Sequence, residues 1–330
     1  MTSPYPHRRQ ALTRLAAVLA AAGTGGPGAW AQAFPSKPVR IIVPFTAGGP
    51  TDLMARVLSK VMTSSLGQTV IVDNKPGGGG VIAFSELAQQ PADGHTLILP
   101  SILAVTNPAL MPNYPFDMAR DFAPVTVVGF IPHALVVRPD FAAKTLAELV
   151  ALGKEKAGSL AYGSSGNGTS AHLAAAMLFE RAGLKMVHVP YRGAGPAMQD
   201  LLGGQIQCMF LDMTSALAQI QAGKLRALAV APARRVPLLP DVPTVAEQGY
   251  PGFNIQAWYG LMVRAGTPAA AVDRLYSEVK RALETTEVRD TFAAQGIVPG
   301  GMPPAEFGAL IRSDLVHWKR TVTELRISLQ

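Results

Sequence analysis

The chain reads VRIIVPFTAGGPTDLMARVL over residues 39–58. Residues 39–45 are mostly apolar, as expected for a strand buried on both faces, and the helical pattern begins at Thr51. The loop between them contains mostly small residues, so that a ligand can approach its backbone, and Pro50 suits a first helical turn. Unpaired N–H groups at a helix N-terminus favour an anion. We therefore predict an anion-binding loop formed by Phe45, Thr46, Ala47, Gly48 and Gly49.

Asp52 follows in the first turn of this expected helix. An acid at this position complements the positive end of the helix dipole without contacting any ligand. It could equally accept a hydrogen bond from a ligand hydroxyl or amine, or orient a bridging water. The sequence leaves both roles open, and Asp52 is included among the candidate site residues.

A second stretch of the same kind reads LAYGSSGNGTSAH over residues 160–172. A short strand again runs into a loop of small residues and then into a helix. Hydroxyl and amide groups lie there beside free backbone N–H groups, although a threonine before a helix can also serve only as its N-cap. A histidine one turn into the helix could face the loop or be packed in the core. The candidate ligand-binding residues here are Ser164, Ser165, Gly166, Asn167, Gly168, Thr169 and His172.

The first 33 residues have the pattern of a secretory signal peptide. Basic residues at positions 7–9 and 14 precede an alanine- and leucine-rich core at 15–22, which is too short to span a bilayer. Small-x-small cleavage sites follow at 29–33. We expect export to the periplasm and removal of residues 1–33, with the Sec and twin-arginine routes both open. Removal takes away three arginines and no acid, so that the net charge falls from +7 to +4.

The remaining charges are scattered, and no long basic run indicates nucleic acid. The six histidines are dispersed and Cys208 is the only cysteine, so we expect neither a metal site nor a disulfide within the chain. Cys208 lies in an apolar strand pattern, where an inert buried thiol is expected. We expect no cofactor and a monomeric protein.

Strands and helices alternate from residue 34 onward, which predicts open, mostly parallel α/β sheets flanked by helices. We expect two lobes joined by crossing strands, with residues 34–132 and 255–330 in lobe 1 and residues 133–254 in lobe 2. Ligands bind at the carboxyl ends of strands in such sheets, where both loops are expected. Tyr191 and Asp212, at later strand ends, are further candidates for the cleft between the lobes. The expected strands are 39–45, 69–73, 96–99, 125–130, 134–137, 160–162, 186–189, 206–210, 225–230 and 257–263, and the expected helices are 51–66, one ending at 88, 146–156, 169–182, 196–202, 269–284 and 304–325.

The second loop allows two other interpretations. Residues 166–171 fit the G-x-G-x-x-A pattern of dinucleotide-binding loops, but the next strand ends in Pro190-Tyr191-Arg192, without the acid that binds a ribose. Ser165 and His172 could be the nucleophile and base of a secreted serine hydrolase, although no G-x-S-x-G elbow surrounds Ser165. A hydrolase that uses this pair stays open as an alternative function.

Short motifs follow one another along the whole mature chain. They are FPSKPVR at 34–40, PFTAGG at 44–49, NKPG at 74–77, PADG at 91–94, GSSG at 163–166, PYRG at 190–193, LLGGQ at 201–205, GKLRAL at 223–228, LPDVPT at 239–244 and WYG at 258–260. In this order they resemble the periplasmic substrate-binding receptors of tripartite tricarboxylate transporters, also called the Bug receptors of Bordetella-like bacteria.

The resemblance implies a two-lobed, type II-like periplasmic binding fold that closes on its ligand. In the family, the loops that match residues 44–52 and 163–172 hold a ligand carboxylate through backbone N–H groups, hydroxyls and ordered waters. The resemblance further implies a receptor without catalysis, which delivers its ligand to the membrane permease subunits of a tripartite transporter. A ligand-binding partner of a membrane sensor stays open as another alternative.

Two positions depart from the family pattern. Thr46 replaces the usual proline of the first loop and adds a hydroxyl and an N–H group. Leu211 stands where relatives often carry an acid, with Asp212 one residue later. Both departures fall near the cleft, so the ligand cannot be transferred from a relative. Tricarboxylates, dicarboxylates, acidic amino acids, aromatic acids and neutral amides of the nicotinamide type all stay open.

Overall fold

The computed structural model describes residues 34–111 and 113–324, so the predicted signal peptide at residues 1–33 lies outside the described residues. The chain divides into two units, residues 1–36 and residues 37–330, and every described helix and strand lies in the second. None of the helices built from described residues has the length and apolar character that a membrane span requires.

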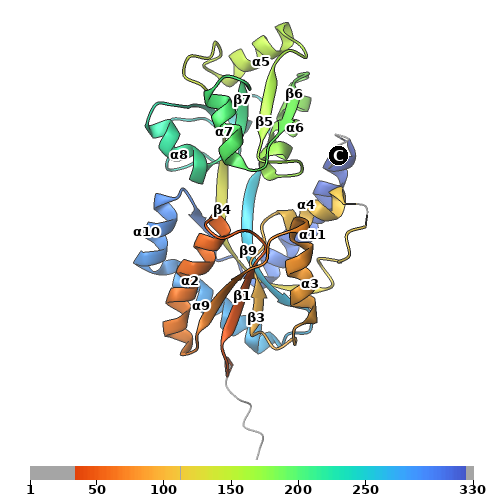
Figure 1. Cartoon of the computed structure of the whole chain (residues 1–330), viewed down its shortest axis with the longest axis vertical. Coiled ribbons are helices and arrows are strands. Elements are labelled where there is room, and N and C mark those ends of the chain that lie inside the picture. The colour runs from red at the N-terminus through yellow and green to blue at the C-terminus, as the bar shows by residue number, and fades with distance from the viewer. Residues whose placement is uncertain (1–33, 112, 325–330) are drawn as a thin grey trace, which may run out of the picture. The chain divides into compact units, whose positions relative to one another are not determined.

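Sheet A begins with three parallel strands (Figure 1). β1 (Val39–Val43) lies between β2 (Val70–Asn74) and β3 (Thr96–Ile98) and pairs with both. Helix α2 (Pro50–Leu66) follows β1, and a short 3-10 turn and helix α3 (Val81–Gln89) follow β2. Four of the five β1 residues are buried, which confirms the expected strand with two covered faces. The first glycine loop therefore connects the carboxyl end of β1 to the N-terminus of α2.

Two long antiparallel strands complete sheet A, and one of them, β4, continues into sheet B. β9 (Gln256–Arg264) pairs with β3 on one side and with β4 (Phe122–Val137) on the other. The β4–β9 ladder runs as far as Pro132, opposite Gln256. From His133 onward β4 pairs instead with two strands of sheet B. Figure 1 shows β4 and β9 as the two ribbons between the upper and lower groups of elements.

The expectation of two separate strands at residues 125–130 and 134–137 was wrong, because β4 is one strand of 16 residues. Pro132 does not interrupt it. A proline lacks the N–H that a sheet interior needs, and it is tolerated where pairing is irregular or changes. Pro132 is the last residue of β4 paired in sheet A, so its missing donor falls where the strand exchanges partners. The lobe boundaries at residues 132/133 and 254/255 stay a prediction.

Sheet B repeats the parallel arrangement. β5 (Ala161–Ser164) lies between β6 (Val187–Pro190) and β7 (Cys208–Asp212) and is parallel to both. β4 pairs antiparallel with β7 on one edge and with β8 (Arg226–Val230) on the other. The helices that alternate with these strands are α5 (Leu146–Glu155), α6 (Ser170–Arg181), α7 (Ala194–Leu202) and α8 (Met213–Gln221). The second glycine loop therefore connects the carboxyl end of β5 to the N-terminus of α6.

Three helices were not expected from the sequence. α4 (Leu103–Leu110) contains Pro108, which argues against a helix in a sequence pattern. α8 has nine residues and begins directly after Asp212, a residue that the sequence analysis assigned only to a strand end. α10 (Thr286–Ala294) begins directly after α9 (Ala269–Glu284), and Thr285 ends one helix and caps the next. A change of helix direction within one residue leaves little trace in hydrophobic periodicity.

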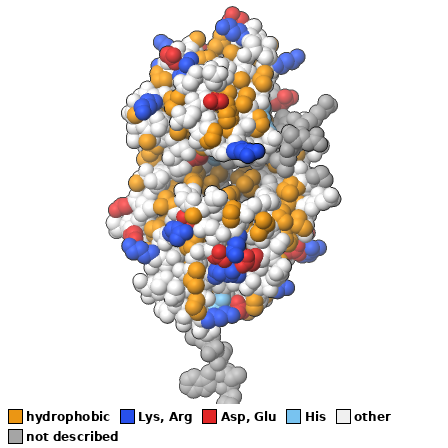
Figure 2. All heavy atoms as spheres, viewed as in Figure 1, with side chains coloured by type: hydrophobic (Ala, Val, Ile, Leu, Met, Phe, Trp, Pro, Cys, Tyr) orange, Lys and Arg blue, Asp and Glu red, His pale blue; other side chains and the backbone are white. Residues whose placement is uncertain are grey.

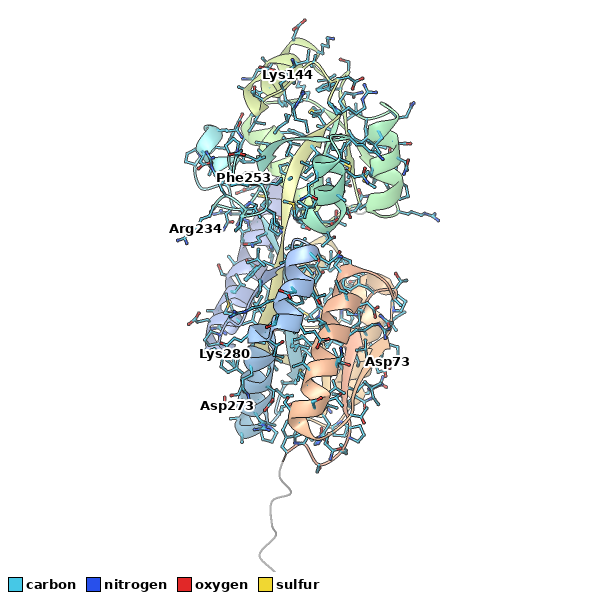
Figure 3. All side chains as sticks on the ribbon, turned by 90° about the vertical axis from the view of Figure 1, so that its left-hand side faces the viewer. Asp73, Lys144, Arg234, Phe253, Asp273 and Lys280 are labelled. Carbon is cyan, nitrogen blue, oxygen red and sulfur yellow. The ribbon has the colours of Figure 1, made fainter. Side chains whose placement is uncertain are left out.

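Helix α11 (Pro304–Glu324) is anchored to the crossing strand β9. The indole of Trp258 meets the ring of Phe307 edge to face, with centroids 5.2 Å apart, and donates a hydrogen bond of 2.8 Å to Asp314. Both rings are almost completely buried. Figure 3 shows Asp273 and Lys280 on α9 beside sheet A, and Lys144 at the opposite end of the molecule beyond sheet B. Cys208 is fully buried, as expected, and burial raises the pKa of its thiol to about 12.

Candidate ligand-binding site

The carboxylate of Asp52 holds the first glycine loop through hydrogen bonds. It accepts hydrogen bonds from the backbone N–H of Gly48 at 3.0 Å and from Nε of Arg56 at 2.8 Å. Nδ2 of Asn74 donates to the same carboxylate at 3.0 Å and to the carbonyl oxygen of Phe45 at 3.1 Å. Burial alone would raise the pKa of Asp52, but these hydrogen bonds outweigh it and the pKa is lowered.

These contacts bear on the two roles that the sequence left open for Asp52. The residue is 4% exposed, and its carboxylate oxygens already serve three donors. Two of these donors belong to the loop and to the neighbouring strand β2. The geometry therefore favours a role in which Asp52 fixes the loop conformation and a ligand meets the loop from the other side.

The second glycine loop is held by the hydroxyl of Thr169. This residue caps α6 and accepts a hydrogen bond of 3.4 Å from the N–H of His172, as its position predicts. Its hydroxyl also donates to the carbonyl of Gly166 at 2.8 Å and accepts from the hydroxyl of Ser165 at 3.3 Å. Gly166 and Gly168 have φ values of +135° and +74°, where a side chain would be strained.

Two stacked histidines, one from α6 and one from β6, support this loop. The rings of His172 and His188 are parallel, with centroids 3.9 Å apart, and Nδ1 of His172 accepts the N–H of Gly168 at 3.1 Å. The hydroxyl of Ser164 lies 2.7 Å from Nε2 of His188. Burial lowers the pKa of both imidazoles to about 4, and for His172 the nearby His188 adds to the effect. His172 thus packs against His188 and also accepts a hydrogen bond from the backbone of the loop.

This arrangement differs from the nucleophile–base pair of a hydrolase. Such a pair requires a hydrogen bond between nucleophile and base. The hydroxyl of Ser165 donates to Thr169, and Nδ1 of His172 is occupied by Gly168. The contacts of Ser165 and His172 therefore do not support the alternative function proposed from the sequence.

A cavity of about 270 Å³ lies where the two loops face each other. Figure 2 shows the surface hollowed between the upper and lower groups of elements, with hydrophobic side chains along the lower edge of the hollow. Six residues predicted from the sequence line it, namely Phe45, Thr46, Gly49, Ser165, Thr169 and Asp212. The cavity thus brings together parts of both loops and the end of β7.

The other predicted residues do not line this cavity. They are Ala47, Gly48, Asp52, Ser164, Gly166, Asn167, Gly168, His172 and Tyr191. Several of them shape the loops instead, as the contacts of Asp52 and His172 illustrate. The hydroxyl of Tyr191 donates to Asp200 at 2.7 Å, which ties the end of β6 to α7.

His133 is a lining residue that the sequence analysis missed. It is 3% exposed, and its Nε2 lies 3.1 Å from the hydroxyl of Ser170, which also lines the cavity. Burial lowers the pKa of His133, although the neighbouring Asp212 opposes the shift. His133 and Asp212 are opposite each other in the β4–β7 ladder. Only this long-range register reveals His133 as a site residue, because its local sequence is that of an ordinary strand.

Tyr259, Ser101 and Thr51 are further lining residues that were not predicted. Tyr259 lies on β9 and Ser101 opposite it in an isolated bridge. Burial raises the pKa of the Tyr259 phenol, and the carboxylate of Asp212 adds to the shift. The phenol is therefore a neutral hydrogen-bond donor among the residues that line the cavity.

Asp212 is the acidic residue of the cavity and caps α8. Its Oδ1 accepts hydrogen bonds from the N–H of Ser215 at 2.9 Å and from the hydroxyl of Thr214. No lysine or arginine occurs among the described residues that line the cavity. An anion bound here would be held by backbone N–H groups, hydroxyls and the N-termini of α2 and α6. Within residues 34–111 and 113–324, no group of three or more His, Cys, Asp or Glu side chains is placed to hold a metal ion.

Two α/β sheets joined by two crossing strands, with a cavity at the glycine loops of both, define a solute-binding protein of the periplasmic type. A family model described as tripartite tricarboxylate transporter family receptor matches residues 54–327. The chain belongs to this receptor family.

Individual relatives support the assignment. The protein BugT of Bordetella pertussis (strain Tohama I) is 38% identical over 325 residues, which cover 97% of this chain and 99% of BugT. The solved structure of Rpa4515 from R. palustris with adipate has a TM-score of 0.79 and 31% identity, and the match covers 89% of this chain and 99% of that one. The structure of MatC from Rhodopseudomonas palustris with bound malate has a TM-score of 0.76 and 32% identity, and the match covers 88% and 100%.

Proposed function

We propose that the exported protein captures a small organic carboxylate in the cavity between its two glycine loops and presents it to the membrane permease subunits of a tripartite transporter. The bound adipate and malate of two structural neighbours support a carboxylate as ligand. The signal-like pattern at residues 1–33 supports the periplasm as its location. Catalysis has no place in this proposal.

One observation carries the proposal, namely that the N-terminal ends of two helices line one cavity. Gly49 caps α2 without any side-chain hydrogen bond, and Thr169 caps α6, and both residues line the cavity. Each helix end carries a partial positive charge and unpaired N–H groups. A carboxylate is a small anion whose two oxygens can accept hydrogen bonds from both ends at once.

Hydroxyl groups complete the expected contacts. Thr46, Ser165 and Ser170 offer hydroxyls on the walls of the cavity. Charge-assisted hydrogen bonds contribute about 1.5–3 kcal/mol each. Micromolar affinity corresponds to about 8 kcal/mol, so four or five such bonds, some through water, are sufficient without an arginine. The carboxylate of Asp212 would accept a hydrogen bond from a ligand hydroxyl or amine rather than bind a ligand acid group.

Thermal unfolding and calorimetry with malate, adipate, citrate, lactate and hexanoate test this proposal. A ligand at 100 times its dissociation constant adds about 2.7 kcal/mol to stability, which gives a clear upward shift in Tm. At least one carboxylate should bind with micromolar affinity. No binding by any carboxylate, in a sample shown to be free of retained ligand after refolding, would contradict the proposal.

A pair of glycine variants locates the site. Gly49→Val places a side chain in the cavity, and only the carbonyl of Thr46 lies within 4 Å of the new β-carbon, at 3.8 Å. Gly195→Val is the control, because Gly195 also lies at a helix start and has open space around it. We expect Gly49→Val to lower carboxylate affinity at least tenfold and Gly195→Val to leave it unchanged. Equal affinities in both variants would place the ligand elsewhere.

A further inference from the structure

A second cavity, of about 310 Å³, lies directly beside the first. The two cavities share four lining residues, Phe45, Thr46, Ser101 and Leu103. A ligand whose carboxylate lies between the glycine loops therefore has a neighbouring space into which the rest of the molecule can extend. The size is considerable, since a cavity of about 150 Å³ lined by apolar side chains is known to hold benzene.

Glycines form part of the wall of this second cavity. Gly77, Gly79 and Gly80 line it, and their φ values of +120°, +61° and +91° are those that side chains rarely adopt. A β-carbon on Gly80 would come within 3.7 Å of the ring of Phe84 and 3.8 Å of Pro44. The run of glycines after β2 thus forms the turn and brings its backbone close to the aromatic ring.

The walls of the second cavity are apolar and fixed. Phe84 is 1% exposed, and its ring packs against those of Phe122 and Phe116 at centroid distances of 4.8 and 6.2 Å. Ala104, at the start of α4, is 3% exposed and also lines this cavity. No charged side chain occurs among the described residues that line this cavity. Thr46 and Ser101 carry the polar side chains among its described lining residues, and both also line the first cavity. A second carboxylate placed beyond them would lose its hydration without meeting a polar side chain, which is costly.

We propose that the second cavity is a subsite for an apolar body, so that the receptor takes monocarboxylates whose other end is a hydrocarbon chain or an aromatic ring. This inference rests on the proposed function and names the ligand class for it. The carboxylate occupies the first cavity between the glycine loops. The hydrocarbon part extends past Phe45 and Leu103 toward Phe84, in contact with the glycine run.

Matched pairs of probes test the inference by calorimetry. Hexanoate and adipate have the same number of carbons and differ only in whether the far end is a methyl or a carboxylate. We expect hexanoate and 3-phenylpropionate to bind at least tenfold more tightly than adipate, and more tightly than the short monocarboxylate lactate. Adipate binding as tightly as hexanoate would overturn the subsite and leave the carboxylate receptor intact. No binding by any of the four would instead contradict the proposed function, and the subsite with it.

Two variants show whether the second cavity is responsible. Ala104→Leu fills part of it, and should lower the affinity for 3-phenylpropionate at least tenfold while changing the affinity for lactate less than twofold. An equal loss for both probes, or no loss for either, would overturn the inference. Phe84→Leu removes the aromatic wall without adding volume, so it decides the question if Ala104→Leu does not fold. The same selective loss for 3-phenylpropionate is expected there, and unchanged affinity for it contradicts the subsite.

Discussion

The imidazole ring of His172 lies parallel to that of His188, with centroids 3.9 Å apart and an angle of 4° between the planes. One ring belongs to the first turn of α6 and the other to β6, so the stack joins the second glycine loop to the sheet behind it. Two protonated imidazoles at this distance would repel each other. The loop that faces the cavity is therefore supported by a pair of groups that resist protonation together.

This stack predicts a loss of stability at mildly acidic pH. Both pKa values are lowered to about 4 in the folded protein, from an ordinary value of 6.5. Between pH 6.5 and 4 the unfolded chain binds more protons than the folded one, so the stability present above pH 6.5 falls as the pH is lowered through this window. The slope is at most about 1.4 kcal/mol per pH unit for each imidazole. His188→Gln should show a smaller fall in Tm between pH 7 and pH 4.5 than the unmodified protein, and equal falls would contradict this account.

Asp52→Asn should destabilise the protein and weaken carboxylate binding together. An asparagine presents one acceptor and one donor group where the N–H of Gly48 and Nδ2 of Asn74 both require an acceptor. A buried donor left without its partner costs about 1–3 kcal/mol. Chemical denaturation measures the stability and calorimetry the affinity. Asp140→Asn, which changes a largely exposed acid, is the control and should stay within about 0.5 kcal/mol.

The cap of α6 can be tested with isosteric variants. Thr169→Val retains the shape of the side chain but removes the hydroxyl that contacts Gly166, Ser165 and His172. We expect a loss of about 1 kcal/mol in unfolding free energy, in the range of other N-cap replacements. Thr169→Ser keeps the hydroxyl and should lose less than half as much. If both variants unfold at the same urea concentration as the unmodified protein, the hydroxyl does not hold the loop.

Replacement of Asp314 by asparagine should raise the stability of the protein at alkaline pH. Burial raises the pKa of the Asp314 carboxyl to about 6 from 3.8, although the hydrogen bond from Trp258 opposes the shift. The folded protein then binds more protons than the unfolded chain between these values, so stability present below pH 3.8 is lost as the pH rises through 6. Asp314→Asn keeps an acceptor for the indole and removes the buried charge. Its Tm should exceed that of the unmodified protein at pH 8 and match it at pH 4. A lower Tm for the variant at pH 8 would contradict this interpretation.

The features predicted correctly from the sequence are those set by neighbouring residues. Each glycine loop follows an apolar strand and precedes a helix, and this pattern located the lining residues Thr46, Ser165 and Thr169 without any knowledge of tertiary contacts. The expected helix at residues 269–284 also agrees with α9 at both ends. Local chemistry determines such elements almost alone.

The features that the sequence did not reveal depend on residues far apart in the chain. His133 reaches the cavity because β4 pairs with β7 in a register that places it opposite Asp212. Asp52 is occupied because Asn74, 22 residues later, donates to it from the neighbouring strand. The second cavity likewise combines the glycine run after β2 with Ala104 from an unexpected helix. None of these relationships has a signature within a short window of sequence.

The continuity of β4 also has a mechanical consequence. The strand is hydrogen-bonded on both sides of Pro132, to β9 in sheet A and to β7 and β8 in sheet B, so no slack linker separates the two sheets at this crossing. We expect any rotation of one sheet against the other to be absorbed as elastic twist in paired strands. A ligand that draws the loops together would then store elastic energy in these strands. Release of the ligand would return that energy. Single-molecule distance measurements should accordingly find one narrow distribution for the free protein, and a broad one would contradict this view.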